Sequence, residues 1–436
     1  MPRWWMGPWH AMMPAMPSIH DIFAGQVEQL RAERDELLAS RGDRELSQVT
    51  VAQANGGLRG VRALLCDTSF VDPERGLFIR GIPVVELLDR YPEDVFFLLL
   101  IGRLPDAEEA DAFRKEIADQ ERVPESVWRV IDEMSAHSHP MSMLATGLLA
   151  LESESVMTRR YADGLQRDDY WKATLADALR LLGSLPTLAG GIYRMRYKKG
   201  PRFAHDPLLD WSQNFGAMCG VRKPVFFEAV RRAAILQSDH EGGNVCAFAC
   251  HTVGSVLSNA YLAVSAGFNG LAGPLHGRAA QESTEWVLGA VTRFRAAPND
   301  AQVEEYAWET LKAGRVVPGH GHAVLRGQDP RFVAMLDFGK KHFGGDPVFA
   351  TVEKMSRIVP EVLKAHGKAR NPYPNVDFGM GAVWHHFGIT ETGYYTVPFA
   401  ISLAMGLLAQ LVINRALGGP IVRPRSVTSE WIRSQV

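Results

Sequence analysis

Cysteine is scarce in this chain, with four residues in 436. That number is too small for a disulfide framework in a protein of this length. Cys246 and Cys250 lie four residues apart and would share one face of a helix, but neither belongs to a CxxC pair. The sequence therefore favours unpaired core cysteines and a reducing compartment, and it predicts no metal site.

The chain also lacks an excess of charge of one sign and long uninterrupted apolar runs. The formal net charge is −2, and without a long basic run we expect neither nucleic acid nor an anionic membrane as a partner. No window reaches the roughly 18 uninterrupted apolar residues of a membrane span. The apolar stretch 399–413 is interrupted by Gly406 and Gln410, so it is predicted to be a buried helix.

Several cofactor-binding motifs are missing. There is no GxxxxGK[ST] motif and no strand-linked GxGxxG motif, so a nucleotide-binding fold is not indicated. His240 and Glu241 begin like HExxH, but Asn244 occupies the position of the second histidine, which argues against zinc. Residues 1–18 resemble neither a secretory signal nor a transit peptide. We therefore expect the cytoplasm of a bacterium, with the mitochondrial matrix as the alternative.

Helical periodicity dominates what is present. From residue 83 onward apolar residues recur at intervals of about 3.6, and Pro, Gly, Ser or Asp mark most helix ends. Strand signals are confined to 64–70 and 77–80, on either side of a turn at 72–76. The sequence predicts a mostly α protein with a small N-terminal β-hairpin and these helices: 19–41, 83–88, 92–101, 107–120, 126–134, 141–151, 170–182, 186–194, 226–237, 245–268, 281–294, 303–313, 330–343, 347–363 and 396–417.

Three Gly- and Pro-rich stretches contain the candidate chemistry. His276 lies in GLAGPLHGR, residues 270–278, between two predicted helices. His322 ends VPGHGH, and Asp377 ends NPYPNVD. A histidine can donate a hydrogen bond or titrate near neutral pH, and a carboxylate can act as a base. The residues alone are compatible with a catalytic site made of His276, His322 and Asp377. They are also compatible with purely structural roles, such as a helix cap for Asp377.

Together these stretches resemble the citrate synthase family, in the longer form typical of mitochondria and found in some bacteria. SDHEGGN (238–244), GLAGPLHG (270–277), VPGHGHAVLRGQDPR (317–331) and NPYPNVD (371–377) occur in the family's order and spacing. The resemblance extends from about residue 19 to 425. It implies a homodimer with a multi-helical large domain, 1–276 and 389–436, and a small, mobile helical domain on the coenzyme A side, 277–388.

The resemblance also implies a reaction. The family condenses acetyl-CoA with oxaloacetate and hydrolyses the thioester, giving citrate and CoA, with no metal or cofactor beyond the CoA substrate. Asp377 would remove a proton from the acetyl methyl group, and His276 would hydrogen-bond the thioester oxygen. His322 would polarise the ketone of oxaloacetate. A carbon acid needs this combination of a base and electrophiles.

The same resemblance implies the binding residues. His240 and Arg331 would hold oxaloacetate, and Arg423 would reach the active site of the neighbouring subunit. Arginine suits such sites because its planar guanidinium binds carboxylates through two hydrogen bonds. The residues that match coenzyme A contacts are Arg167, Val316, Gly319, Lys368, Ala369 and Asn375.

The chain departs from the family pattern on the acceptor side. Leu403 stands where the family's SRALG has an arginine that grips a carboxylate of oxaloacetate. His320 replaces a tyrosine and Phe248 a histidine. Three interpretations remain: a citrate synthase that tolerates the change, a related condensing enzyme with another 2-oxo acid or a longer acyl-CoA, or a non-catalytic paralogue that serves as a binding partner. The retained His276, His322 and Asp377 favour the first two.

Overall fold

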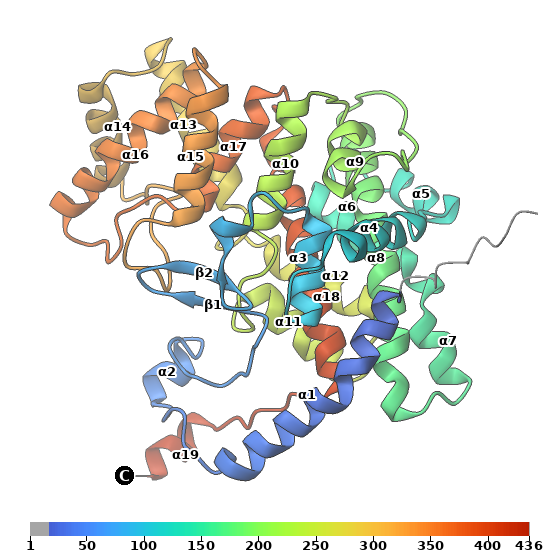
Figure 1. Ribbon diagram of the computed structural model, residues 1–436. Coiled ribbons are helices and arrows are strands. Elements are labelled where there is room, and N and C mark those ends of the chain that lie inside the picture. Colours follow the sequence, from blue (N-terminus) through green and yellow to red (C-terminus); the bar gives the residue numbers. More distant parts are fainter. Residues whose placement is uncertain (1–16, 436) are drawn as a thin grey trace, which may run out of the picture.

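The computed structural model describes residues 17–435 and is built almost entirely of helices (Figure 1). The prediction that residues 1–18 are neither a secretory signal nor a transit peptide falls mostly on residues 1–16, which lie outside the described part. The α-helices are α1 (Ile19–Arg41), α2 (Val51–Asn55), α3 (Pro92–Ile101), α4 (Ala107–Asp119), α5 (Glu125–Asp132), α6 (Pro140–Leu151), α7 (Val156–Ala162), α8 (Tyr170–Arg196), α9 (Trp211–Met218), α10 (Pro224–Leu236), α11 (Val245–Gly254), α12 (Ala260–Leu271), α13 (Ala279–Phe294), α14 (Asp300–Lys312), α15 (Pro330–His342), α16 (Pro347–His366), α17 (Val376–His386), α18 (Thr396–Ala416) and α19 (Ser429–Ser434). The short 3₁₀ helices are η1 (Val84–Leu87), η2 (Glu152–Glu154), η3 (Arg167–Asp169) and η4 (Thr392–Tyr394). The mostly α class is confirmed.

Helix α18 is the centre of the large helical layer, and it packs against α3, α8, α10, α11 and α12. The segment Thr392–Ala416 is long and apolar enough to cross a membrane, but 83% of its most apolar window is buried inside the protein. Such burial is that of a core helix, because a helix that is hydrophobic all round needs neighbours on every side. The predicted buried helix is therefore confirmed.

Two predictions place breaks between helices wrongly, and a third differs in the type of element. The predicted pair 170–182 and 186–194 is one continuous helix, α8, with Pro186 inside it. The predicted single helix 245–268 is two, because the chain turns at Leu257, whose φ is +65°. Asn259 then caps α12 by accepting a hydrogen bond from the Leu262 amide. The predicted helix 83–88 consists of a strand residue followed by η1.

A small antiparallel sheet of β1 (Ser69–Asp72), β2 (Gly76–Ile79) and β3 (Ile82–Pro83) connects the N-terminal region to the site. Strand β1 begins later than the predicted 64–70. The Asp72 side chain accepts the Glu74 and Arg75 amides at 2.9 and 2.8 Å and so closes the predicted turn. A Cβ on Gly76 would lie 2.9 Å from Pro330, so the turn packs directly on the start of α15.

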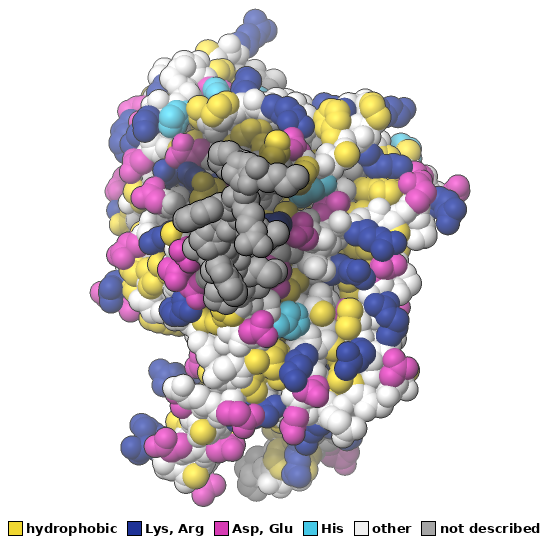
Figure 2. All heavy atoms as spheres, turned by 45° about the vertical axis from the view of Figure 1, so that its right-hand side comes forward, with side chains coloured by type: hydrophobic (Ala, Val, Ile, Leu, Met, Phe, Trp, Pro, Cys, Tyr) yellow, Lys and Arg dark blue, Asp and Glu magenta, His cyan; other side chains and the backbone are white. Residues whose placement is uncertain are grey.

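Helices α13 to α17 pack mainly on one another and form the group at the upper left of Figure 1. The C-terminal tail and helices α1 and α2 extend from the opposite end of the molecule (Figure 1). Figure 2 shows Lys, Arg, Asp and Glu side chains interspersed over one face outside its grey atoms, without a large area of one sign. The candidate site lies where the α13 to α17 group meets the sheet and the loop before α11.

Candidate active site

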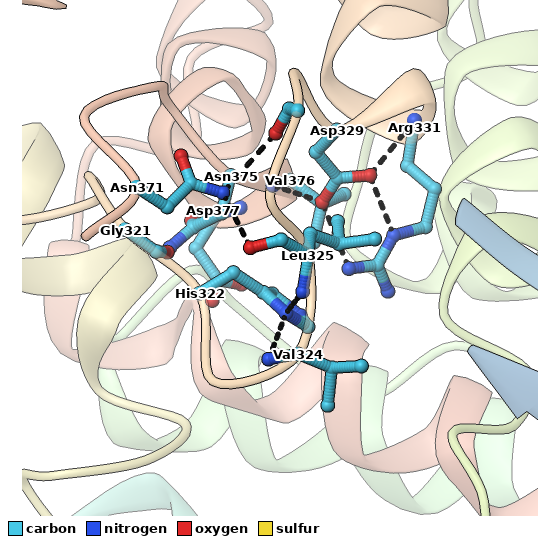
Figure 3. Close-up of polar contacts among 11 residues, drawn as sticks. Gly321, His322, Val324, Leu325, Asp329, Arg331, Asn371, Asn375, Val376 and Asp377 are labelled. Atoms are coloured by element: carbon cyan, nitrogen blue, oxygen red, sulfur yellow. Dashed lines mark hydrogen bonds and ion pairs between the residues drawn. The ribbon is translucent and has the colours of Figure 1, made fainter. Parts of the chain in front are cut away.

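Two of the three predicted loops lie side by side, although they are about fifty residues apart in sequence. The Gly321 amide donates to the Tyr373 carbonyl at 2.9 Å, and the Asn375 amide donates to the Gly319 carbonyl at 3.0 Å. The Asn375 side chain donates to the Gly321 carbonyl at 3.0 Å. Gly319 has a φ of +73°, a conformation that glycine adopts without strain. These bonds fix His322 and Asp377 relative to each other (Figure 3).

The protonation state of His322 follows from its hydrogen bonds. Its Nδ1 accepts the backbone amides of Val324 and Leu325 at 3.0 and 2.9 Å, so Nδ1 carries a lone pair. Burial, and next the nearby Arg331 charge, lower the pKa of His322 to about 4. The ring is therefore neutral at pH 7 and protonated at Nε2. Nε2 has no protein partner among the described residues and is not buried, so its N–H is available to a ligand.

Asp377 lies in the first turn of α17, which begins at Val376, within the last two residues of the predicted loop. Asn375 caps this helix, and its side-chain oxygen accepts the Asp377 amide at 3.1 Å. The Asp377 Oδ1 atom is buried and has no hydrogen-bond partner among residues 17–435. Burial raises the pKa of Asp377 to about 6, although the Arg331 charge opposes that rise. A carboxylate without partners is more basic than one in water, as a proton-abstracting group requires.

Arg331 is held by a second carboxylate, that of Asp329. Two parallel hydrogen bonds join them, Nε to Oδ1 at 3.0 Å and Nη2 to Oδ2 at 2.8 Å. Both side chains are buried, with 6% and 2% of their area exposed. Asp329 also accepts the Val376 amide at 3.1 Å, so it joins Arg331 to the start of α17 (Figure 3). The remaining Nη1 of Arg331 has no protein partner among the described residues.

His240 lies beside His322, with 5.5 Å between the ring centroids. Burial, and next the Arg331 charge, lower its pKa to about 3, so this ring is also neutral. Its position depends on the buried Asp239, which accepts the His240 amide at 2.9 Å, the Thr68 hydroxyl at 2.6 Å and the Gln410 amide group at 2.8 Å. The rings of His240 and His322, both partly exposed, therefore lie together near the Arg331 guanidinium.

Among the described residues, the His276 side chain makes no hydrogen bond to the network around His322, Asp377 and Arg331. Its Nε2 lies 3.0 Å from the Cys246 sulfur and 3.2 Å from the Asn244 side-chain oxygen, both at the start of α11. Burial lowers the pKa of His276. Its connection to Asp377 runs through α13, whose Ser283 hydroxyl donates to the Asp377 carbonyl at 3.3 Å. The neighbouring Leu275 side chain is fully exposed.

The remaining predicted residues fall into two groups. Val316, Lys368 and Ala369 are exposed, and Gly319 and Asn375 lie in the joined loops. Arg167 and Arg423 lie elsewhere. Among the described residues, the one side-chain hydrogen bond of Arg167 goes to the Gly418 carbonyl, beyond the end of α18, at 3.0 Å. Arg423 is exposed on the tail that follows.

The structure reveals two contributors that sequence reasoning did not identify. Asp329 fixes Arg331, and Cys246 contacts His276. The first had a signal, because an Asp-Pro pair is typical of a helix start and places its carboxylate near the second helical residue. Cys246 had none, since its contact depends on how α11 meets a loop thirty residues away.

Comparisons with known proteins agree with this geometry. The family model for the citrate synthase C-terminal domain matches residues 57–425. The chain is 41% identical over 423 residues to mitochondrial citrate synthase of Daucus carota, with 94% of this chain and 90% of that protein covered. It belongs to the citrate synthase family.

Other similar proteins include citrate synthases and a 2-methylcitrate synthase. Mitochondrial citrate synthase of Saccharomyces cerevisiae is 40% identical over 426 residues, covering 95% of this chain and 88% of that protein. The mitochondrial 2-methylcitrate synthase of Gibberella moniliformis is 41% identical over 435 residues, covering 95% and 92%. The crystal structure of citrate synthase from Pyrobaculum aerophilum superposes with a TM-score of 0.76 at 26% identity, covering 86% of this chain and 92% of that one.

The citrate synthase fold and a citrate synthase-type condensation are thus those of this protein, which is a transferase. Among residues 17–435, no group of three or more His, Cys, Asp or Glu side chains is arranged to hold a metal ion.

Proposed function

We propose that Asp377, His276 and His322 condense acetyl-CoA with oxaloacetate, and that hydrolysis of the citryl thioester then gives citrate and CoA. The observation that carries this assignment is the contrast between two groups in one buried network. Asp377 has a carboxylate oxygen without a partner in the described part of the chain, whereas His322 is a neutral ring that presents an N–H. These are a base and an electrophile poised for a carbon acid and a ketone.

In this assignment Asp377 takes a proton from the acetyl methyl group and His276 donates a hydrogen bond to the thioester oxygen. The resulting carbon nucleophile attacks the ketone of oxaloacetate. The oxyanion that develops there accepts a hydrogen bond from the Nε2–H of His322. The free Nη1 of Arg331 and the ring of His240 hold the acceptor. Val316, Gly319, Lys368, Ala369 and Asn375 contact coenzyme A along the joined loops.

The test is a thiol-release assay on the purified protein, followed by identification of the product. Acetyl-CoA and oxaloacetate should give CoA and citrate in equal amounts. A protein that releases no CoA with any pair of acyl-CoA and 2-oxo acid would be the non-catalytic paralogue.

A second candidate concerns the acceptor, because the position of Leu403 favours a change there. Leu403 is 1% exposed on α18, one turn before Gly406, whose added Cβ would lie 2.3 Å from the Asp239 carboxylate. Residues three apart share a helix face, so the hydrocarbon side chain of Leu403 lies on the face of α18 that meets Asp239. That face is directed towards the region of the adjacent His240. A second carboxylate buried there without a partner would lose about 3–5 kcal/mol of binding, the cost of leaving a buried charge unpaired.

This candidate is an enzyme of the same reaction class that accepts a 2-oxo acid with one carboxylate, or a longer acyl-CoA. The similarity to a 2-methylcitrate synthase is consistent with variation of the substrates within the family. A panel of 2-oxo acids and acyl-CoAs separates the two candidates by kcat/KM. Preference for the pair of oxaloacetate and acetyl-CoA over every other pair, by tenfold or more, would remove the second candidate.

We also propose a homodimer in which Arg423, and with it Arg167, serves the partner's active site. Two observations support this: both residues lie apart from the other site residues of their own chain, and the tail exposes Ile421, Val427 and Trp431. Mixing inactive Asp377→Asn and Arg423→Gln subunits by refolding should restore about a quarter of full activity, because half of the dimers are mixed and each has one intact site. No recovery would exclude the shared site.

Two further proposals concern movement and location. Residues 277–388 form a small domain that closes on the large domain, 1–276 and 389–436, and small-angle scattering should show compaction when both substrates are added. The mitochondrial relatives favour the matrix over the bacterial cytoplasm expected from the sequence. Imaging of a C-terminally tagged chain in its own host tests this.

A further inference from the structure

His276 faces two protein groups through one nitrogen and none through the other. Nε2 lies 3.0 Å from the Cys246 sulfur and 3.2 Å from the Asn244 Oδ1 atom. Nδ1 has no protein partner among the described residues, and the His276 side chain is partly exposed. Nδ1 is therefore the nitrogen that can reach a substrate. A neutral imidazole has one proton, so the position of that proton decides whether His276 donates to the substrate or accepts from it.

The two neighbours of Nε2 favour opposite positions of the proton. The identity of the Asn244 oxygen is fixed, because it accepts the Cys246 backbone amide at 2.9 Å and so caps α11. An acceptor beside Nε2 favours a proton on Nε2, which would leave Nδ1 unable to donate. A thiol can instead donate its hydrogen to Nε2. Among the described residues the thiol is the one group within hydrogen-bonding distance of Nε2 that can do so.

We propose that the Cys246 thiol donates to Nε2 of His276, keeps the imidazole proton on Nδ1, and is thereby a positioning residue for the condensation. The inference rests on the proposed role of His276 as the donor to the thioester oxygen. Cys246 itself does not touch the substrate, since its side chain is fully buried.

The charges of the pair are consistent with this arrangement. Burial raises the pKa of the Cys246 thiol to about 12, and burial lowers the pKa of His276. Proton transfer from sulfur to nitrogen would create a thiolate and an imidazolium in a site that disfavours both charges. The contact is therefore a neutral S–H to nitrogen hydrogen bond, and the thiol keeps its proton.

Three substitutions separate hydrogen-bond donation from packing. Cys246→Ser keeps a donor, whereas Cys246→Ala and Cys246→Val remove it with a smaller and a larger side chain. The Ala and Val variants should lose about 10²-fold in kcat with little change in KM for acetyl-CoA. Cys246→Ser should restore most of the kcat that Cys246→Ala loses. Turnover in the Ala and Val variants equal to that of the unmodified protein would overturn the proposal.

The tautomer is also measurable without turnover. Nitrogen-15 chemical shifts of labelled histidine distinguish a protonated from an unprotonated ring nitrogen, and the His276 signal is identified by its loss in His276→Gln. We expect the proton on Nδ1 in the unmodified protein and in Cys246→Ser, and on Nε2 in Cys246→Ala. The same tautomer in all three would refute the role of Cys246. If His276→Gln itself turns over normally, the proposed role of His276 fails instead, so the two failures are distinguishable.

Discussion

Replacing Asp377 by asparagine should make the folded protein more stable while it removes the base. Asparagine has the shape of protonated aspartate but no charge to desolvate. Burial raises the pKa of Asp377 from an ordinary 3.8 to about 6, so the folded state binds this proton more tightly than the unfolded state does. The charged form is disfavoured on folding, and this destabilisation is fully present above pH 6. It decreases as the pH falls through 6 and disappears below about 3.8.

The magnitude follows from the same two values. The destabilisation is about 3 kcal/mol at pH 8 and about 1 kcal/mol near pH 4.5. Urea unfolding of the wild type and Asp377→Asn, at equal protein concentration, should show the variant more stable by these amounts. The matched control is Asp329→Asn, since the Arg331 charge holds the pKa of Asp329 below its usual value. Breaking that buried pair should destabilise by about 3–5 kcal/mol. An Asp377→Asn variant less stable than the wild type at pH 8 would refute the reasoning.

Two further predictions concern the same loops. Because Asp377 acts as a carboxylate whose pKa is about 6, kcat/KM for acetyl-CoA should be constant above that pH and fall about tenfold for each pH unit below it; an acidic limb near pH 4 would contradict the assigned environment. Gly319→Ala should destabilise by about 1–3 kcal/mol, because its φ is +73° and a Cβ would lie 2.9 Å from Phe378 and Ser283. Unchanged urea unfolding of that variant would show that the loop relaxes freely.

The fold was largely predictable because most helices carry local signals. Helix α1 begins and ends at the predicted residues, 19 and 41, and Ser18 caps it with Asp21 in a capping box. Periodicity could not reveal that Pro186 continues α8, because a proline in a helical pattern normally ends or kinks the helix. Helix α17 was missed for a different reason. Eight of its eleven residues are buried, so it has no polar face to produce a period.

The site was predictable where it depends on loops and not where it depends on packing. The glycines and prolines around His322 and Asp377 mark conformations that bring a backbone close to its neighbours, and the structure joins those two loops. The Asp-Pro helix start was a local signal that the Asp329 carboxylate lies near Arg331, but no local pattern shows that the pair is buried. The contact between Cys246 and His276 likewise depends on tertiary structure. The roles of Arg167 and Arg423 remain predictions, because they depend on a second subunit.

The decisive measurement is the turnover of Asp377→Asn with acetyl-CoA and oxaloacetate, followed as the rates of CoA release and of citrate formation. We expect a loss of about 10²–10⁴-fold in kcat, the range for removing a positioned base, in a variant that is folded and still binds coenzyme A. Citrate formation at the wild-type rate would contradict it.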